Sequence, residues 1–444
     1  MAESRDETDE PPVVARELAI VCLVAAVAGA LIGFVGGAFR WCLLRADAAR
    51  IDLLGWAHEL PGPGWLIPMG VTAVCAAIAA LIVRWVPFAS GSGIQHVEAV
   101  SRGEVDPPQF RILPATLVGG VLSIGSGLVL GREGPIVHMG AVAGAETARR
   151  AGMNADHQRL LQTSVSGAGL AVAFNAPIGG ALFVFEEVMH SFRLRTVVPV
   201  LVSVAVGVAC SRLVVGDSPD FSVGPVDPPS ITLLPVFVVF GLLTGVLGAA
   251  YNRAVMGSLS VVDALRSVPS VVKATAIGGA IGLLSAASPP ATGGGDSLVQ
   301  HVLSGGALAI PLVALYVALR FATGPVSYAA GTPGGLFAPL LALGALWGVL
   351  YAGICHAIVP GIDSSVAVPM AIVGMASMFS ATVRAPVTGA VLVMEMTATT
   401  SVTVPMLAAV AGAFAVAQLM GSSPIYDSLR ERMLAQLHHP PRGD

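Results

Sequence analysis

Gly131-Arg132-Glu133-Gly134-Pro135 places an ionisable pair inside apolar sequence, between Val129-Leu130 and Ile136-Val137. A carboxylate at membrane depth costs about 2.5 to 3.5 kcal/mol on insertion scales, so we expect Glu133 to be compensated and to have a function. Glycine lets the backbone approach an ion closely, and proline suits the first turn of a helix. The pentapeptide therefore predicts an unwound break before a helix that begins near Pro135.

The start of such a helix is a site for an anion. Its first N–H groups have no intrahelical partner, and it carries about half a positive charge. Glu133 would be a tethered anion beside this site, competing with a free anion when ionised and withdrawing when protonated. That behaviour would link anion movement to proton movement. The simpler alternative is that Glu133 only caps the helix or pairs with Arg132.

The composition is that of an integral membrane protein. Of 444 residues, 55% are hydrophobic and 11% are charged, and the mean hydropathy is +0.81. Apolar runs long enough to span ~30 Å of hydrocarbon recur along the chain, without the alternation of barrel strands. The first run, 18–39, follows an acidic segment and is expected to remain as a helix rather than be cleaved as a signal peptide. The sequence therefore predicts an all-α polytopic membrane protein.

The charges exclude a nucleic-acid surface and give a prediction of orientation. The formal net charge is −4 and Lys273 is the single lysine. The positive-inside rule would place two arginine-bearing regions on the cytoplasmic side, one after the first span and one near the C-terminus: Arg40, Arg45 and Arg50, and Arg430 and Arg432.

Neither the cysteines nor the histidines form a metal-binding pattern. The five cysteines lie in or beside apolar runs without CxxC spacing, which is typical of small buried side chains. Cys355-His356 and His438-His439 are adjacent pairs without a second pair of ligands. No catalytic or nucleotide motif is present, so we expect neither a metal, nor a cofactor, nor an enzyme.

Two segments of the second half repeat segments of the first. Asn175–Glu186 aligns without gaps on Arg384–Glu395, a shift of 384 − 175 = 209 residues. Pro135–Ala141 aligns on Pro339–Ala345, a shift of 339 − 135 = 204 residues. Motif pairs in the same order at nearly the same shift indicate an internal duplication.

The duplication predicts the organisation of the chain. We expect an acidic N-terminal tail (1–17), a first membrane repeat (18–215), a linker (216–230), a second membrane repeat (231–420) and a C-terminal segment (421–444). Gly331–Pro339 becomes the partner of the opening pentapeptide, since each is a glycine-rich break before a helix that starts with proline. The prediction is two inverted-topology repeats whose broken helices meet at a midplane anion site. A polar loop carrying Glu98 is expected between the second span and the run that starts near Ile112.

Four separated motifs resemble those of the CLC family of chloride channels and proton-coupled chloride transporters. They are Gly91-Ser92-Gly93-Ile94, Gly131-Arg132-Glu133-Gly134-Pro135, Gly334-Gly335-Leu336-Phe337-Ala338-Pro339, and Tyr426 in the C-terminal segment. The resemblance covers nearly the whole chain. It implies a multi-pass protein of the cell (inner) membrane, a homodimer with a separate pathway in each subunit, and chloride and protons as substrates.

In the family, a serine hydroxyl, a tyrosine hydroxyl and two backbone amides hold a dehydrated anion. The resemblance assigns these roles to Ser92, Tyr426 and the N–H groups of Leu336 and Phe337, and neutral donors hold an anion without trapping it. Serine at this position favours chloride over nitrate. Without the resemblance, each residue has a simpler interpretation: Ser92 would be a turn residue, and Tyr426 would be an aromatic residue at the membrane interface. Gln95 stands where the family's motif normally ends in proline, so the site is expected to survive with altered rate or selectivity.

Two glutamates distinguish the possible transport mechanisms. Glu133 resembles the family's gating glutamate, and Glu187 occupies the position where transporters usually have a glutamate for internal proton transfer. Glu186 has a repeat partner in Glu395, whereas Glu187 faces Met396, so Glu187 is an addition to one half. The prediction is exchange of chloride for protons.

Three alternatives remain beside exchange. One is a passive voltage- or pH-gated chloride channel of the same fold, and another is a Glu187 that is only a helix-end carboxylate. A fluoride exporter is disfavoured, because the fluoride branch departs from the serine motif. The chain ends 444 − 426 = 18 residues after Tyr426, so no nucleotide-binding regulatory domain is expected.

Overall fold

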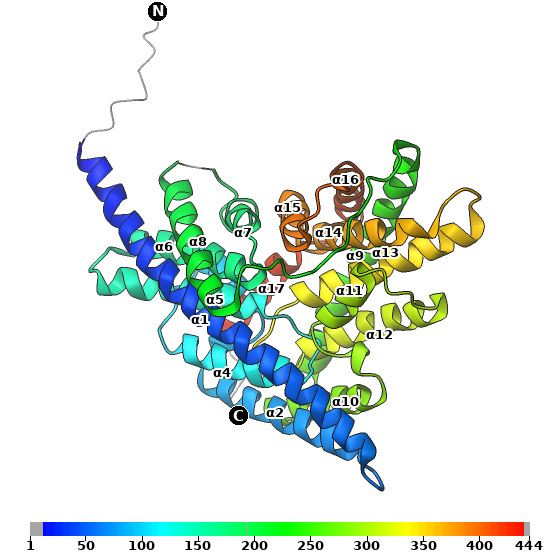
Figure 1. Ribbon diagram of the computed structural model, residues 1–444. Helices are drawn as coiled ribbons and strands as arrows, with labels where there is room; N and C mark the ends of the chain where they lie inside the picture. The colour runs from blue at the N-terminus through cyan, green and yellow to red at the C-terminus, as the bar shows by residue number, and fades with distance from the viewer. Residues whose placement is uncertain (1–11, 193, 439–444) are drawn as a thin grey trace, which may run out of the picture.

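The computed structural model describes residues 12–192 and 194–438 and is almost entirely helical there (Figure 1). The first eleven residues of the predicted acidic tail, and His439 of the terminal histidine pair, lie outside the described residues. Within them the extended contacts are two isolated bridges, Gly91 with Pro333 and Gly131 with Gly335. The helices of the first half are α1 (Pro12–Glu59), α2 (Leu66–Trp85), α3 (Ile94–Ser101), α4 (Ile112–Gly125), α5 (Glu133–Arg150), α6 (Ala155–Phe174), α7 (Pro177–Phe183) and α8 (Leu194–Val215).

The second half has the same number of helices in a matching order. They are α9 (Leu234–Ala264), α10 (Ser270–Ala287), α11 (Asp296–Leu303), α12 (Ile310–Tyr328), α13 (Phe337–Ile358), α14 (Ala367–Val383), α15 (Pro386–Thr397) and α16 (Thr403–Leu419), followed by α17 (Ile425–His438). In each half the long first helix packs against the last, as α1 does with α8 and α9 with α16. Likewise α5 packs against α6, and α13 against α14.

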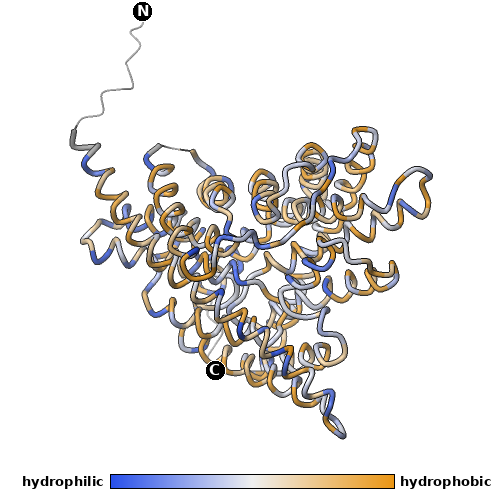
Figure 2. Tube along the Cα trace, in the orientation of Figure 1, coloured by the Kyte–Doolittle hydropathy of each residue, from blue (hydrophilic) through white to orange (hydrophobic). Residues whose placement is uncertain are grey.

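Eight helices of the described chain are long and apolar enough to cross a membrane. Hydrophobic residues run along the helices throughout, and hydrophilic residues gather at helix ends and where the two halves meet (Figure 2). Between the spans lie short helices such as α3, α7 and α11, of eight, seven and eight residues. This combination confirms the all-α polytopic fold with broken helices.

Backbone and side-chain details repeat between the halves. Asn175 and Arg384, which align in the sequence, both follow the last residue of a helix in a left-handed conformation, with φ of 51° and 76°. The Glu186 carboxylate accepts hydrogen bonds from the N–H groups of Val387 (3.0 Å) and Thr388 (2.6 Å), at the start of α15.

The Glu395 carboxylate makes the equivalent contact in the opposite direction, from the second half to the first. It accepts hydrogen bonds from Ile178 (3.0 Å) and Gly179 (2.7 Å), at the start of α7. Glu186 and Glu395, which align in the sequence, therefore make equivalent contacts in the two halves. The domain boundaries themselves stay predictions, with α8 ending at Val215 and α9 beginning at Leu234.

Two cavities open at opposite ends of one span. α10 has 18 residues and is about 27 Å long at 1.5 Å per residue. Its first residues line a cavity with Gly91, Gln95 and Arg432, which we call the Gln95 vestibule. Near its other end, Ser285 accepts a hydrogen bond from Arg50 at 3.2 Å. The neighbouring Gly293 lines a cavity with Arg132, Glu133 and Asp220, which we call the Glu133 vestibule.

This arrangement corrects the prediction of orientation. Arg50 and Arg432 lie near opposite ends of α10, so the two arginine-bearing regions do not share one side of the membrane. The positive-inside rule counts Lys and Arg in short loops and near the ends of spans, whereas Arg40, Arg45 and Arg50 all lie inside the long helix α1, which continues to Glu59.

Candidate ion-transport site

The two glycine-rich breaks bring two helix starts together. Gly131 and Gly335 exchange backbone hydrogen bonds of 2.8 Å in both directions. α5 begins at Glu133, two residues before the predicted Pro135, and α13 begins at Phe337. The first N–H groups of both helices therefore lie at one junction, as predicted for a site that attracts an anion.

The serine motif joins the same junction. Gly91 donates from its N–H to Thr332 at 3.2 Å and accepts from Gly334 at 3.0 Å. Gly91 and Gly93 have φ of 68° and 74°, which glycine adopts readily. A Cβ on Gly134 would lie 2.7 Å from the Cβ of Ser92, so the first turn of α5 can touch Ser92 only because residue 134 has no side chain.

Glu133 is a buried carboxylate at this junction. Its side chain is 1% exposed, and its Oε2 accepts a hydrogen bond from the N–H of Ala338 in the first turn of α13, at 3.4 Å. Its Oε1 has no hydrogen-bond partner within the described residues. The carboxylate of one repeat thus points at the helix start of the other, where a free anion would bind.

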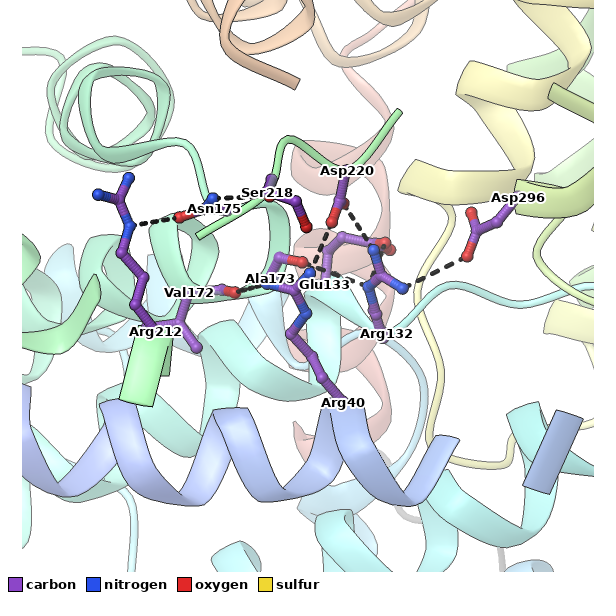
Figure 3. A network of polar contacts seen from close by, with 10 residues as sticks. All are labelled: Arg40, Arg132, Glu133, Val172, Ala173, Asn175, Arg212, Ser218, Asp220 and Asp296. Carbon is purple, nitrogen blue, oxygen red and sulfur yellow. Dashed lines mark hydrogen bonds and ion pairs between the residues drawn. The ribbon is translucent and has the colours of Figure 1, made fainter. Parts of the chain in front are cut away.

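The alternative that Arg132 simply neutralises Glu133 fits the distances poorly. The Nε of Arg132 lies 4.0 Å from Glu133, whereas its Nη2 lies 2.6 Å from Asp220. Its Nη1 lies 3.4 Å from Asp296 (Figure 3). Arg132 is therefore held mainly by two other carboxylates, Asp220 in the linker and Asp296 at the start of α11.

Ser92 is fully buried, and its hydroxyl is already engaged. It donates a hydrogen bond to Oε1 of Gln95 at 2.7 Å and accepts one from the N–H of Ile94 at 3.3 Å. Gln95 stands where the family's motif normally has proline. This difference from the family therefore changes the hydrogen bonding of Ser92, the proposed anion ligand. The N–H of Ser92 donates to the hydroxyl of Tyr328 at 3.4 Å.

Tyr426 and Phe337 lie next to each other. Tyr426 is fully buried, and its hydroxyl has no hydrogen-bond partner within the described chain. Its ring stacks on that of Phe337, with centroids 5.9 Å apart. Phe174, Phe183 and Phe379 pack around the same ring at centroid distances of 6.1, 5.9 and 4.7 Å. This aromatic cluster excludes water from the start of α13, where the N–H groups of Leu336 and Phe337 lie.

The helix that carries Tyr426 is tied to the helix that carries the serine motif. α17 packs against α3. Beyond the end of α3, Arg102 pairs with Asp427 at 2.8 Å and Glu104 pairs with Arg430 at 2.7 Å. These ion pairs fix the two elements that bear Ser92 and Tyr426 relative to each other.

Glu187 lies apart from the other predicted residues. It is 6% exposed, in a π-helical turn (Val184–Val188) that follows α7 and contacts α3. Among the described residues it makes no hydrogen bond or ion pair with Glu133, Ser92 or Tyr426. π-helical turns interrupt regular helices, frequently at functional sites.

Several residues of the site were not predicted. Glu98 was expected in a polar loop, but it lies in α3, is 1% exposed, and neither carboxylate oxygen has a hydrogen-bond partner within residues 12–192 and 194–438. Asp220, Asp296 and Tyr328 were also missed. The available signal was the position of Glu98 six residues after Ser92, in the short helix α3 that begins two residues after Ser92.

Across the described residues, 12–192 and 194–438, no group of three or more His, Cys, Asp or Glu side chains is placed to hold a metal ion. Apart from the Glu133 carboxylate, the groups assigned to the anion are hydroxyls and backbone N–H groups, which suit an anion rather than a cation.

Comparison with known proteins identifies the family. Residues 74–418 match the family model described as voltage gated chloride channel. The H(+)/Cl(-) exchange transporter ClcA of Vibrio parahaemolyticus is 35% identical over 422 residues, which cover 93% of this chain and 90% of that protein. ClcA of Cronobacter sakazakii is 35% identical over 426 residues, covering 94% and 90%.

A solved structure agrees in fold over the same extent. The crystal structure of a slow cyanobacterial Cl-/H+ antiporter superposes with a TM-score of 0.88 at 31% identity, covering 94% of this chain and 99% of the other. The extent and the level of identity are those of a common family. The chain therefore belongs to the voltage gated chloride channel family, the CLC family that its motifs resemble.

Proposed function

We propose that this chain is a secondary active transporter that exchanges chloride for protons across the cell membrane. The observation that carries the proposal is the position of Glu133. Its carboxylate is buried at the junction of two helix starts, with one oxygen on the N–H of Ala338 at 3.4 Å and the other without a partner among the described residues. The names of the relatives, exchange transporters and an antiporter, support it.

Chloride takes its ligands from neutral donors on both halves of the chain. These are the hydroxyls of Ser92 and Tyr426 and the N–H groups of Leu336 and Phe337. The glycines and Pro135 of the three motifs let the backbone segments approach each other and start the helices there. When Glu133 is ionised it occupies the anion position at the start of α13, and when it is protonated it leaves that position to chloride.

Glu187 passes protons between Glu133 and one side of the membrane. Its burial in a π-helical turn beside α3 supports the role, because a buried carboxylate inside a membrane protein is costly and is therefore a candidate functional residue. Glu187 has no counterpart in the other half, where Met396 stands. Among the described residues Glu187 makes no hydrogen bond or ion pair with Glu133, so a proton would need intermediate carriers to pass between the two carboxylates.

The competing function is a passive chloride channel of the same fold. The test is flux in liposomes that contain the purified protein. An imposed chloride gradient drives protons uphill if the chain is an exchanger. Chloride flux without proton movement would identify a channel and refute exchange.

The remaining proposals concern assembly and chemistry. We propose a homodimer in which each subunit has its own pathway, two membrane repeats at 18–215 and 231–420, and transport without a cofactor, a metal or an enzymatic step. Cross-linking of the purified protein in detergent and in bilayers tests the dimer. A single species of monomer mass in both would contradict it.

A further inference from the structure

The linker between the two halves places a carboxylate on two arginines directly beside the Glu133 vestibule. Asp220 lies 2.6 Å from Nη2 of Arg40 and, through its other oxygen, 2.6 Å from Nη2 of Arg132 (Figure 3). The Asp220 side chain is 4% exposed, and the two arginine side chains are 12% and 15% exposed. Two guanidinium groups around one carboxylate form a strong, charge-assisted anion contact.

The two guanidinium groups are held in place independently of Asp220. Nη1 of Arg40 donates to the carbonyl of Val172 at 2.9 Å, and Nε of Arg132 donates to the carbonyl of Ala173 at 3.3 Å. Both carbonyls belong to the last turn of α6. The arginines would therefore still point at the same place if the carboxylate withdrew.

The linker is fixed to both halves on either side of Asp220. The Nδ2 of Asn175 donates to the carbonyl of Ser218 at 2.9 Å, in the first half (Figure 3). Gln300 of the second half accepts from the N–H of Ser222 at 2.9 Å and donates to its carbonyl at 2.7 Å. The segment thus crosses from one half to the other at the vestibule and brings its single buried carboxylate to the arginine pair.

This contact lies on the route to Glu133. The cavity that Asp220 and Arg132 line is also lined by Glu133 and by Ala338, the residue whose N–H binds Glu133. The unpartnered Oε1 of Glu133 is a second buried polar atom at the same cavity. Asp47 and Asp296 are the other two carboxylates that line this cavity. Asp296 lies 3.4 Å from Arg132 and is 53% exposed.

We propose that Arg40 and Arg132 form an outer binding site for a small inorganic anion, and that Asp220 occupies this site as a built-in competitor. Chloride arriving at the Glu133 vestibule displaces the Asp220 carboxylate before it reaches the helix starts. The inference rests on the proposed chloride transport and extends it by one binding step. Asp220 is a positioning residue here, since it acts through the two arginines.

Removing the charge of Asp220 should strengthen chloride binding from one side of the membrane. If the displaced Asp220 carboxylate is taken to lie about 7 Å from the bound chloride, its unit charge changes the chloride affinity by about three-fold at a dielectric constant of 80 and about fifty-fold at 20. We therefore expect Asp220→Asn to lower the chloride concentration for half-maximal flux by a factor in that range at one face and to leave the other face unchanged. Flux from right-side-out and inside-out membrane vesicles separates the two faces.

Asp217→Asn is the matched control. Asp217 lies in the same linker and also pairs with an arginine, Arg212, at 2.9 Å, but its side chain is 65% exposed. Its removal should leave the chloride dependence at both faces unchanged. Equal changes at both faces in Asp220→Asn, or the same change in Asp217→Asn, would overturn the proposal.

Thermal unfolding gives a second readout that a purely structural ion pair would not produce. If chloride replaces the carboxylate, chloride should stabilise Asp220→Asn more than it stabilises the wild type, and gluconate at equal ionic strength should not. Equal stabilisation by both salts, or an Asp220→Asn protein that is unstable in both, would also overturn the proposal. Absence of proton coupling in the wild type would instead refute the exchange function and leave the anion site intact.

Discussion

Replacing Gln95 with alanine tests how the departure from the family's serine motif acts. The Ser92 hydroxyl gives its hydrogen to Oε1 of Gln95 at 2.7 Å, so chloride must break this bond before Ser92 can donate to it. A hydrogen bond contributes a net ~0.5 to 1.5 kcal/mol. At RT of 0.59 kcal/mol, this is a factor of about 2 to 13 in affinity. Gln95→Ala should therefore tighten chloride binding by about 2- to 13-fold.

The assay is calorimetric titration of chloride into the purified protein, with Ser92→Ala as the partner in a double-mutant cycle. Because Gln95 acts through Ser92, the gain from Gln95→Ala should disappear in the Ser92→Ala background. Weaker binding in Gln95→Ala would refute this reasoning, because it would mean that Gln95 itself donates its amide group to the anion. A gain that persists without the Ser92 hydroxyl would do the same.

Three further substitutions test the other assigned roles. Glu133→Gln should abolish proton coupling while chloride flux continues, and pH-dependent flux in this variant would contradict its role as the gate. Glu187→Gln should uncouple protons while chloride flux is kept, and undiminished proton transport would remove it from the mechanism. Glu395→Gln should lower the free energy of unfolding by about 1.5 to 3 kcal/mol, the range for hydrogen bonds to charged groups. This substitution removes the negative charge that accepts hydrogen bonds from two backbone N–H groups at the start of α7. An unchanged melting temperature would show that this cap does not stabilise the fold.

The general architecture followed from the sequence because it depends on local patterns. Apolar runs predicted the spans, and the glycine-rich stretches predicted the breaks. The two alignments paired Gly131–Pro135 with Gly331–Pro339 and Glu186 with Glu395. In the structure Gly131 and Gly335 are hydrogen-bonded to each other, and Glu186 and Glu395 each accept hydrogen bonds from the start of a helix in the other half.

The residues that were missed depend on contacts over long sequence distances. Asp220 meets Arg40 and Arg132 across 180 and 88 residues, so no local pattern predicts the pairs. Glu98 was assigned to a loop because charged residues follow it at Arg102 and Glu104, although α3 buries it. The Ser92 to Gln95 contact was within reach, because a serine followed three residues later by glutamine at a helix start has the spacing of a capping box.

The most direct test of the central claim is proton movement in liposomes that contain the purified wild-type chain. With equal pH on both sides and a chloride gradient across the membrane, chloride leaving the liposomes should drive protons inward and make the interior more acidic than the exterior. A matched preparation of Glu187→Gln should move chloride without protons. Chloride flux in the wild type with no proton movement would contradict exchange and identify the chain as a channel.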